Sequence, residues 1–359
     1  MSNRLHGVAN VAQLADFDEV IDVRSPAEFA EDRLPRAVNC PVLDDEQRAS
    51  IGTLYKQVSP FAAKKAGAAL VARNIATHIE QQFLDKPREW RPLLYCWRGG
   101  QRSGAFSHVL RQVGWDAQRL EGGYKAWRRH VLDEMETLPQ RFRYRIVSGP
   151  TGSGKSRLLE ALALRGAQVL HLEELAAHKG SVLGALPGAA QPSQKMFESR
   201  LYLALAALDP ERPVFVEAES RRIGNLQLPD LLLEQIRASP GVQIDATTTA
   251  RVDFLLRDYD YFLADPGWLV EKLLHLEGLQ SRETLSRWAD LIAAREFRAL
   301  VGELLELHYD PLYQRSQTRN YAGFGSAACL PTDDLSPAGI TALAHEILAG
   351  AHSAPGVSA

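Results

Sequence analysis

The amino-acid sequence predicts an α/β protein made of two domains, each built around a parallel β-sheet. The chain has 359 residues, and single hydrophobic cores rarely grow beyond about 250–300 residues. In both halves short apolar strands alternate with helical patterns, which is typical of parallel sheets covered by helices. Pro139 and the charged segment after it separate the two series. We therefore expect a first domain over residues 1–138 and a second, with additional helices, over residues 139–359.

The expected elements follow from the spacing of apolar residues. Ala105, Val109 and Val113, for example, recur on one face of a helix. The expected strands are 19–24, 92–96, 117–120, 144–147, 167–172, 212–218, 241–246 and 327–334. The expected helices are 61–84, 102–113, 124–135, 281–307 and 337–349.

Composition narrows the class of protein and its compartment. The formal net charge is −3, so charge alone does not predict nucleic-acid binding, although a local basic patch stays open. The three cysteines, Cys40, Cys96 and Cys329, form no CxxC pair, which favours free thiols in a reducing compartment. The N-terminus has no apolar signal segment, and the run at 201–208 is far shorter than a membrane span of about 20 residues. We expect a cytoplasmic protein without membrane association.

The segment GPTGSGKS fits the phosphate-binding pattern G-x-x-x-x-G-K-[ST] between an expected strand and an expected helix. Its glycines let backbone N–H groups turn towards phosphate oxygens, and the helix N-terminus adds positive potential. Lys155 is expected to reach the terminal phosphates and Ser156 to ligate Mg²⁺ if that ion is present. The predicted phosphate-binding residues are Gly149, Thr151, Gly152, Ser153, Gly154, Lys155 and Ser156.

An acidic strand end follows this loop in the sequence. Glu217 and Glu219 end or follow the strand in PVFVEAES, where a carboxylate commonly holds Mg²⁺ through water. Either glutamate could serve, and a solvated strand end is the alternative. No NKxD motif follows, which argues against a GTPase. Mg²⁺ is thus a candidate ion, and no other metal is predicted: His171 and His178 lack a third ligand nearby.

The segment YCWRGGQRSG places Cys96 at the carboxyl end of a buried strand, directly before a helix. Ligands bind at this edge of a parallel sheet. The glycines, the helix N-terminus and the arginines would stabilise a thiolate, a persulfide, a selenide or a phosphate-like leaving group. Cys96 is therefore the predicted nucleophile. The anion cradle around it is predicted to comprise Arg98, Gly99, Gly100, Arg102 and Ser103.

Other features have a structural explanation or stay open. Cys40 and Cys329 lie in apolar surroundings that favour a packing role. Trp97 could stack on a nucleobase or pack against its own loop. The arginines of RFRYR (141–145) could contact phosphates or form one solvated strand face.

Several segments of the first domain together resemble a rhodanese domain. They are IDVRSPAEFAEDRLPRAVNCP (21–41), the Cys96 loop and LEGGYKAW (120–127). The resemblance implies that Asp22 and Arg24 are framework residues, that Trp127 belongs to the core and that Cys96 carries the transferred sulfur.

A rhodanese domain followed by a phosphate-binding loop resembles the bacterial tRNA 2-selenouridine synthase family. The Cys96 loop matches that family's C-x-R-G-G-x-R-S pattern, GTLYKQVSP (52–60) resembles its insertion, and VFVEAESRRIG (214–224) resembles part of its second domain. The resemblance runs from about residue 15 to beyond residue 225. Cys40, where an apolar residue is more usual, and the bulky Trp97 depart from the pattern.

The resemblance implies a specific chemistry. The family acts on tRNA at a wobble 2-thiouridine, geranylates the sulfur with geranyl diphosphate and replaces it with selenium from selenophosphate. Cys96 would handle selenium, and the loop around Lys155 would hold the diphosphate. No tightly bound cofactor is implied, and an enzyme that supplies selenophosphate is a candidate partner.

Two other functions remain open from the sequence. One is a tRNA or protein sulfurtransferase whose second domain activates the acceptor with ATP. The other is a non-catalytic nucleotide sensor that docks a partner, which would leave the Cys96 loop without a purpose.

Overall fold

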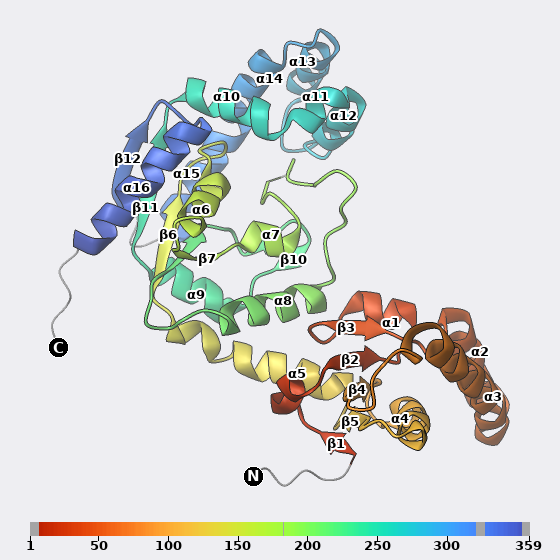
Figure 1. The fold of residues 1–359 in the computed structure, drawn as a ribbon. Helices are drawn as coiled ribbons and strands as arrows, with labels where there is room; N and C mark the ends of the chain where they lie inside the picture. Colours follow the sequence, from red (N-terminus) through yellow and green to blue (C-terminus); the bar gives the residue numbers. More distant parts are fainter. Residues whose placement is uncertain (1–6, 182, 321–326, 354–359) are drawn as a thin grey trace. The chain divides into compact units, whose positions relative to one another are not determined.

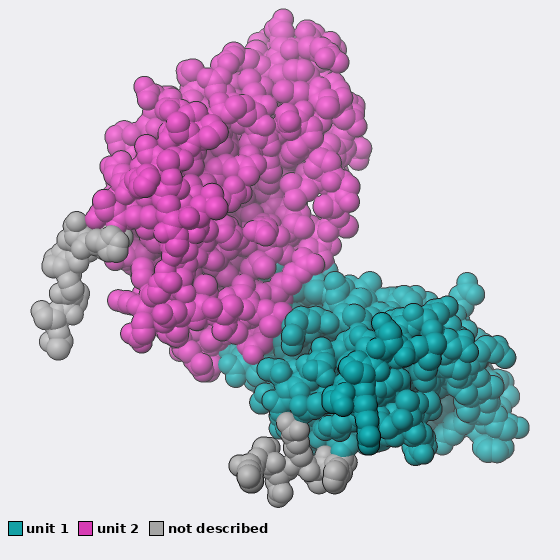
Figure 2. Space-filling model, in the orientation of Figure 1, with its two compact units in different colours: residues 1–134, 193–199 teal, residues 135–192, 200–359 magenta. Residues whose placement is uncertain are grey.

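The computed structural model describes residues 7–181, 183–320 and 327–353. The chain forms two compact units (Figure 2). The first comprises residues 1–134 with 193–199, and the second comprises residues 135–192 with 200–359. The α/β fold class expected from the sequence is confirmed, since each unit contains a five-stranded parallel sheet.

The sheet of the first unit has the strand order β1-β5-β4-β2-β3, and every pair in it is parallel. Its strands are β1 (Val8–Ala9), β2 (Glu19–Asp22), β3 (Ala37–Asn39), β4 (Pro92–Tyr95) and β5 (Gln118–Leu120). Its helices are α1 (Pro26–Glu31), α2 (Asp45–Gln57), α3 (Pro60–His78), α4 (Gln101–Val113) and α5 (Tyr124–Met135). Because β4 lies inside the sheet and is buried along its length, the segment after it is held firmly.

Helices α2 and α3 form a helical hairpin between β3 and β4 (Figure 1). The Asp44 side chain caps the first helix and Ser59 caps the second. Pro60 at the first position of α3 suits a helix start, because that position needs no N–H donor. The helix expected over 61–84 is α3 followed by one π-helical turn, Ile79–Phe83.

The sheet of the second unit has the order β12-β11-β6-β8-β7, again all parallel. Its strands are β6 (Tyr144–Ser148), β7 (Gln168–Leu170), β8 (Val214–Glu217), β11 (Gly241–Ala246) and β12 (Ala328–Thr332). Helices α6 (Lys155–Ala163) and α16 (Pro337–Ser353) contact each other and contribute to one apolar core with this sheet (Figure 1). A short antiparallel hairpin, β9 (Arg222–Ile223) and β10 (Leu226–Gln227), follows β8. The other helices before β11 are α7 (Leu172–Ala176), α8 (Gln194–Ala206), whose first residues belong to the first unit, and α9 (Asp230–Ala238).

Between β11 and β12 the chain adds a helical region with its own apolar core. Its helices are α10 (Thr248–Asp258), α11 (Asp260–Ala264), α12 (Pro266–Leu274), α13 (Arg282–Ala293), α14 (Phe297–Leu304) and α15 (Asp310–Asn320), with a π-helical turn at Leu305–Tyr309. The helix expected over 281–307 is therefore interrupted. Arg295 lies in the left-handed region with φ 58° between α13 and α14.

Two further expectations concern single residues and membranes. Cys40 is buried, as expected for a packing residue, but the expectation for Cys329 is wrong because its side chain is exposed on β12. Among the described residues, no helix combines the length and the apolar character that crossing a bilayer requires.

Candidate functional site

Cys96 follows β4 directly and is 3% exposed. Gly100 adopts φ 73° and begins α4, so the chain turns sharply from strand to helix around the thiol. The Ser103 hydroxyl donates to Cys96 Sγ at 3.5 Å. Within the described part of the chain, no hydrogen bond uses the backbone N–H groups of residues 97–103 as donors. These donors are therefore available to an anion at the loop.

The turn before α5 fixes the position of this loop. The backbone N–H of Tyr124 donates to the Cys96 carbonyl at 2.8 Å, and that of Lys125 donates to the Trp97 carbonyl at 3.1 Å. Gly123 has φ 58°, and a Cβ there would collide with the Cys96 carbonyl oxygen. The Trp97 and Tyr124 rings lie 5.3 Å apart, so Trp97 packs within the loop region.

Three arginines lie near the thiol, and they differ in their exposure and in their ion pairs. Arg98 is exposed. Arg102 donates to both Glu28 carboxylate oxygens, at 2.6 and 3.1 Å, so much of its charge is offset. Arg119 lies against the loop, since a Cβ on Gly100 would meet its guanidinium at 2.8 Å. A third arginine, which is not part of the motif, therefore lies beside this loop.

Asp22 and Arg24 form a buried ion pair beneath this edge of the sheet. Arg24 Nη2 lies 2.6 Å from Asp22 Oδ2, and both side chains are fully buried. The guanidinium also lies 4.1 Å from the centre of the Tyr124 ring. Both residues therefore join β2 to the turn that holds the Cys96 loop, a framework role.

In the second unit, β6 leads through residues 149–154 into α6. Gly149, Gly152 and Gly154 all have φ values between 78° and 153°. Space is also limiting, because a Cβ on Gly149 would lie 2.9 Å from the Ile244 carbonyl oxygen. Only glycine suits these positions, so the backbone forms the inward turn that a phosphate requires.

The side chains of Lys155, Ser156 and Ser153 differ in their hydrogen bonds. Lys155 Nζ donates to the Gly149 carbonyl at 2.9 Å, so the ammonium lies over the loop. The Ser156 hydroxyl donates to Glu173 Oε2 at 2.6 Å. Ser153 is fully buried, and its Oγ has no hydrogen-bond partner among the described residues. The Thr151 carbonyl accepts from Arg251 Nε at 2.8 Å, which anchors the loop to α10.

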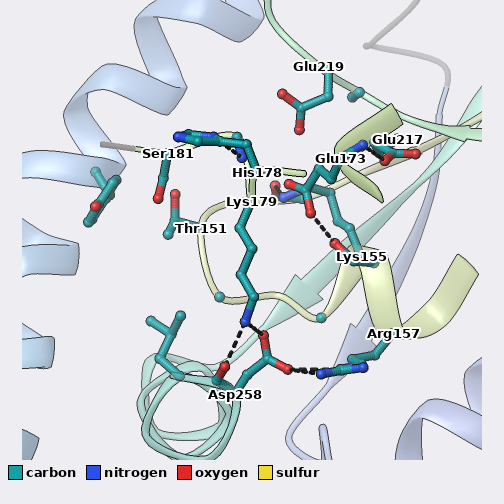
Figure 3. A pocket seen from close by; sticks show the side chains of 18 of the residues that line it. Thr151, Lys155, Arg157, Glu173, His178, Lys179, Ser181, Glu217, Glu219 and Asp258 are labelled. Carbon is teal, nitrogen blue, oxygen red and sulfur yellow. Dashed lines mark hydrogen bonds and ion pairs between the residues drawn. The ribbon is translucent and has the colours of Figure 1, made fainter. Parts of the chain in front are cut away.

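Three carboxylates lie on one side of the loop: Glu173 on α7, Glu217 at the end of β8 and Glu219 just beyond it (Figure 3). Glu217 Oε1 accepts from the Glu173 backbone N–H at 2.9 Å. Burial, and after it the electrostatic repulsion from Glu173, raises the pKa of Glu217 to about 8. Burial followed by repulsion from Glu173 and Glu217 raises the pKa of Glu219 well above its usual range. Glu217 and Glu219 therefore hold protons at neutral pH.

The opposite side of the site carries cations. Lys179 reaches across to Asp258 at 2.6 Å, and Arg157 meets the same carboxylate at 2.7 Å (Figure 3). Burial alone would raise the pKa of Asp258, but the two cations outweigh it and hold that pKa below its usual value. Asp258 therefore stays ionised and positions both cations at the cavity.

These side chains line a cavity of about 610 Å³ over the phosphate loop. A smaller pocket of about 60 Å³ adjoins it and has mostly apolar walls, including Leu255, Phe262, Leu300 and Leu304. Thr151, Ser181, Leu255, Tyr259 and Tyr309 line both spaces. A ligand with a phosphate head and an apolar tail could occupy both.

All predicted phosphate-binding residues lie in one loop, and Glu217 and Glu219 both line its cavity. Glu217 faces the α7 backbone, whereas Glu219 is near enough to Lys155 for the ammonium to favour its ionised form. Sequence reasoning missed Glu173, Lys179 and Asp258. The position of Glu173 directly after a predicted strand was the available signal, since strand ends meet at one edge. Among the described residues, no three His, Cys, Asp or Glu side chains are grouped so that they could hold a metal ion by themselves.

Comparisons with known proteins agree with this arrangement. Residues 8–130 match the rhodanese-like domain family, and residues 142–266 match the tRNA 2-selenouridine synthase AAA domain. A tRNA 2-selenouridine synthase of Nitrosomonas europaea is 39% identical over 244 residues, which cover 67% of this chain and 63% of that protein.

Other relatives match over more of their length. The protein of the same name from Alcanivorax borkumensis is 38% identical over 332 residues, covering 84% of this chain and 90% of that one. The Aeromonas salmonicida protein is 32% identical, covering 82% and 86%. With both domain families matched in order and 90% of one relative covered, the chain belongs to the tRNA 2-selenouridine synthase family.

Proposed function

We propose that this protein converts a wobble 2-thiouridine of tRNA into 2-selenouridine. The reaction has two stages: the sulfur is alkylated by geranyl diphosphate, and selenium from selenophosphate then replaces the S-geranyl group. The observation that carries the proposal is the phosphate-loop cavity with an apolar pocket opening beside it. An alkyl diphosphate needs both features, whereas a free phosphate needs only the first.

In the first stage, the uridine sulfur attacks the first carbon of the geranyl chain. A C–S bond forms, the C–O bond to the diphosphate breaks, and the diphosphate leaves with its electron pair. The base loses its N3 proton to solvent, which gives the neutral S-geranyl base. Lys155 and the N–H groups of the loop would stabilise the charge that develops on the leaving oxygen. Lys179 is the second cation available to it, once released from Asp258. The apolar pocket is small, so we propose that it takes only part of the geranyl chain.

In the second stage, the selenium atom of selenophosphate attacks C2 of the base. A C–Se bond forms and the C–S bond breaks with departure of the geranyl thiolate. Water then cleaves the P–Se bond, which releases phosphate and leaves 2-selenouridine. We assign the handling of selenium to Cys96, with the cradle of N–H groups, Arg98 and Arg119 favouring anions there. The Ser103 hydroxyl donates a hydrogen bond to Cys96 Sγ and so helps to hold the sulfur in place.

Mg²⁺ fits this site as a companion of the diphosphate. The ion usually takes one or two carboxylates together with phosphate oxygens. Ser156 and Glu173 would hold it, and it would neutralise charge on the leaving diphosphate. We propose no tightly bound cofactor. We further propose that the protein works in the cytoplasm on tRNA and receives selenophosphate from a separate supply enzyme.

The test uses purified protein, a 2-thiouridine anticodon stem-loop, geranyl diphosphate and selenophosphate, with nucleosides identified by mass spectrometry. We expect S-geranyl-2-thiouridine without selenophosphate and 2-selenouridine with it, both in the absence of ATP. A strict requirement for ATP, with release of AMP or ADP, would favour the sulfurtransferase alternative. Absence of any modified nucleoside under all conditions would contradict the proposal.

A further inference from the structure

The helical hairpin α2–α3 has an unusual charge. Beyond Asp45 and Glu46 in the first turn of α2, the hairpin contains no aspartate or glutamate, although the whole chain carries a net charge of −3. The segment carries five cationic side chains, all exposed, and none belongs to an ion pair among the described residues. They are Arg48, Lys56, Lys64, Lys65 and Arg73. The hairpin is therefore a local basic surface on an acidic protein.

The turn of the same hairpin exposes large apolar side chains. Tyr55 is 54% exposed, Val58 71% and Phe61 68%. Lys65 Nζ lies 5.0 Å from the centre of the Phe61 ring, so cationic and aromatic groups alternate here. An aromatic ring left in water does not contribute the free energy that its burial would give to folding. We therefore expect these two exposed rings to bind a partner rather than to stabilise the fold.

Packing of the hairpin does not require these side chains. Its buried contacts are made by Ala63, Gly67 and Ile75 on α3, and Gly67 packs against Ile51 of α2. The Ser59 hydroxyl accepts from the backbone N–H groups of Phe61 and Ala62 at 3.2 and 3.4 Å. This cap stabilises the start of α3, directly beside the turn that carries the exposed rings.

We propose that the turn of the α2–α3 hairpin binds single-stranded RNA of the tRNA substrate, with bases stacking on Tyr55 and Phe61. Phosphates of the same strand lie against Lys56, Lys64 and Lys65. Aromatic platforms beside cations are how proteins hold single-stranded nucleic acid, because every base has a face that can stack. The inference rests on the proposed function, which makes tRNA the substrate.

The charge pattern disfavours a second copy of the chain as the occupant. A two-fold interface would bring this basic surface against itself, and the carboxylates of the hairpin, Asp45 and Glu46, lie at the start of α2 and not at its turn. RNA, in contrast, is complementary to the surface both in charge and in its stacking faces.

The test measures binding of a fluorescent anticodon stem-loop by anisotropy at several salt concentrations. Tyr55→Ala and Phe61→Ala should each weaken binding about tenfold and leave the salt dependence unchanged, because stacking involves no counterions. The double variant Lys64→Ala/Lys65→Ala should instead lower the slope of log K against log salt by about 0.7 for each phosphate that the protein no longer neutralises. The two sets of variants therefore measure the contributions of stacking and of charge to RNA binding separately.

Matched controls lie outside the hairpin. Leu84→Ala removes an apolar side chain that is 74% exposed in the same unit, and Arg129→Ala removes an exposed cation of α5. Both should bind RNA as the unaltered protein does, and circular dichroism checks that every variant is folded. Equal binding by the hairpin variants and the unaltered protein would overturn the inference while leaving the proposed function intact. If the unaltered protein showed no RNA binding, both the inference and the proposed function would be refuted.

Two further measurements address other occupants. Analytical ultracentrifugation that found a dimer dissociated by Phe61→Ala would assign the turn to a second copy. A vesicle sedimentation assay with anionic phosphatidylserine tests lipid binding. If the unaltered protein sediments with the vesicles, Phe61→Ala does not, and Phe61→Ala binds RNA normally, the turn binds a lipid surface. Either result would overturn the RNA assignment.

Discussion

The hydroxyl of Ser156 donates a hydrogen bond of 2.6 Å to Glu173 Oε2, which joins the phosphate loop to α7. Ser156 is the residue that would ligate Mg²⁺ in this motif. The Glu173 carboxylate already lies beside that position, and the carboxyl group of Glu219, whose pKa is raised, lies near Lys155. The loop therefore lies between an acidic side and the cations Lys179 and Arg157, which sets its response to phosphate, to Mg²⁺ and to pH.

Replacing Glu173 should change how the loop responds to Mg²⁺. In Glu173→Ala, geranyl diphosphate should bind more tightly without Mg²⁺, because a nearby negative charge is gone, and added Mg²⁺ should help less. Isothermal titration calorimetry with and without Mg²⁺ measures both effects. Glu234→Ala, an exposed carboxylate of α9 outside the cavity, is the control. An undiminished Mg²⁺ effect in Glu173→Ala would exclude this residue from the ion's site.

Removing the ammonium of Lys155 should weaken diphosphate binding. A hydrogen bond to a charged group contributes about 1.5–3 kcal/mol, so Lys155→Ala should raise the Kd for geranyl diphosphate about 10- to 150-fold. The control Arg282→Ala removes an exposed cation of the same unit that lies outside the cavity. Equal affinity of Lys155→Ala and the unaltered protein, again by calorimetry, would mean that the diphosphate binds elsewhere.

The two stages of the proposed reaction should separate in Cys96→Ser. The substitution is close to isosteric, so the fold should be kept, but the serine hydroxyl stays protonated where a thiolate is needed. Selenation should fall by at least about 100-fold while geranylation continues, so S-geranyl-2-thiouridine accumulates. Mass spectrometry of the digested tRNA measures both nucleosides. Cys329→Ser, which alters an exposed thiol, is the control, and normal selenation by Cys96→Ser would refute the assignment.

The stability of the second unit should depend on pH through Glu217. Its pKa is raised by burial to about 8 from an ordinary value of 4.5, so the folded state binds more protons than the unfolded state between these values. Its contribution to stability is therefore present below about pH 4.5 and is lost as the pH rises towards 8, by at most about 1.4 kcal/mol per pH unit. Urea denaturation from pH 5 to 8 should show a shallower fall for Glu217→Gln. Glu219 adds a dependence of the same sign, so part of the fall should remain.

The turn that holds the Cys96 loop should tolerate no side chain at Gly123. Gly123→Ala places a Cβ against the Cys96 carbonyl oxygen and forces alanine into the left-handed region. The free energy of unfolding should drop by more than about 2 kcal/mol. Gly99→Ala, where no atom lies within 4 Å of the added Cβ, should keep nearly full stability. Equal melting temperatures for the two variants would contradict this account of the turn.

Much of this protein was predictable from local sequence. The strands at 92–96 and 241–246 are read from short apolar runs, and the helix over 124–135 from its apolar spacing; in the structure they are β4, β11 and α5. The phosphate loop could also be predicted from the sequence, because its function depends on glycine conformations and on a helix that starts within a few residues. Such features depend on neighbours along the chain, so the sequence alone determines them.

Tertiary structure decided what comes from distant segments. Glu173, Lys179 and Asp258 reach the phosphate loop from α7, the segment after it and α10. Arg119 reaches the Cys96 loop from β5, while Glu28 on α1 engages Arg102. No local pattern encodes these encounters, because strand order and helix packing bring the side chains together. The raised pKa values of Glu217 and Glu219 likewise follow from burial beside Glu173, so only the folded chain determines the electrostatic character of the site.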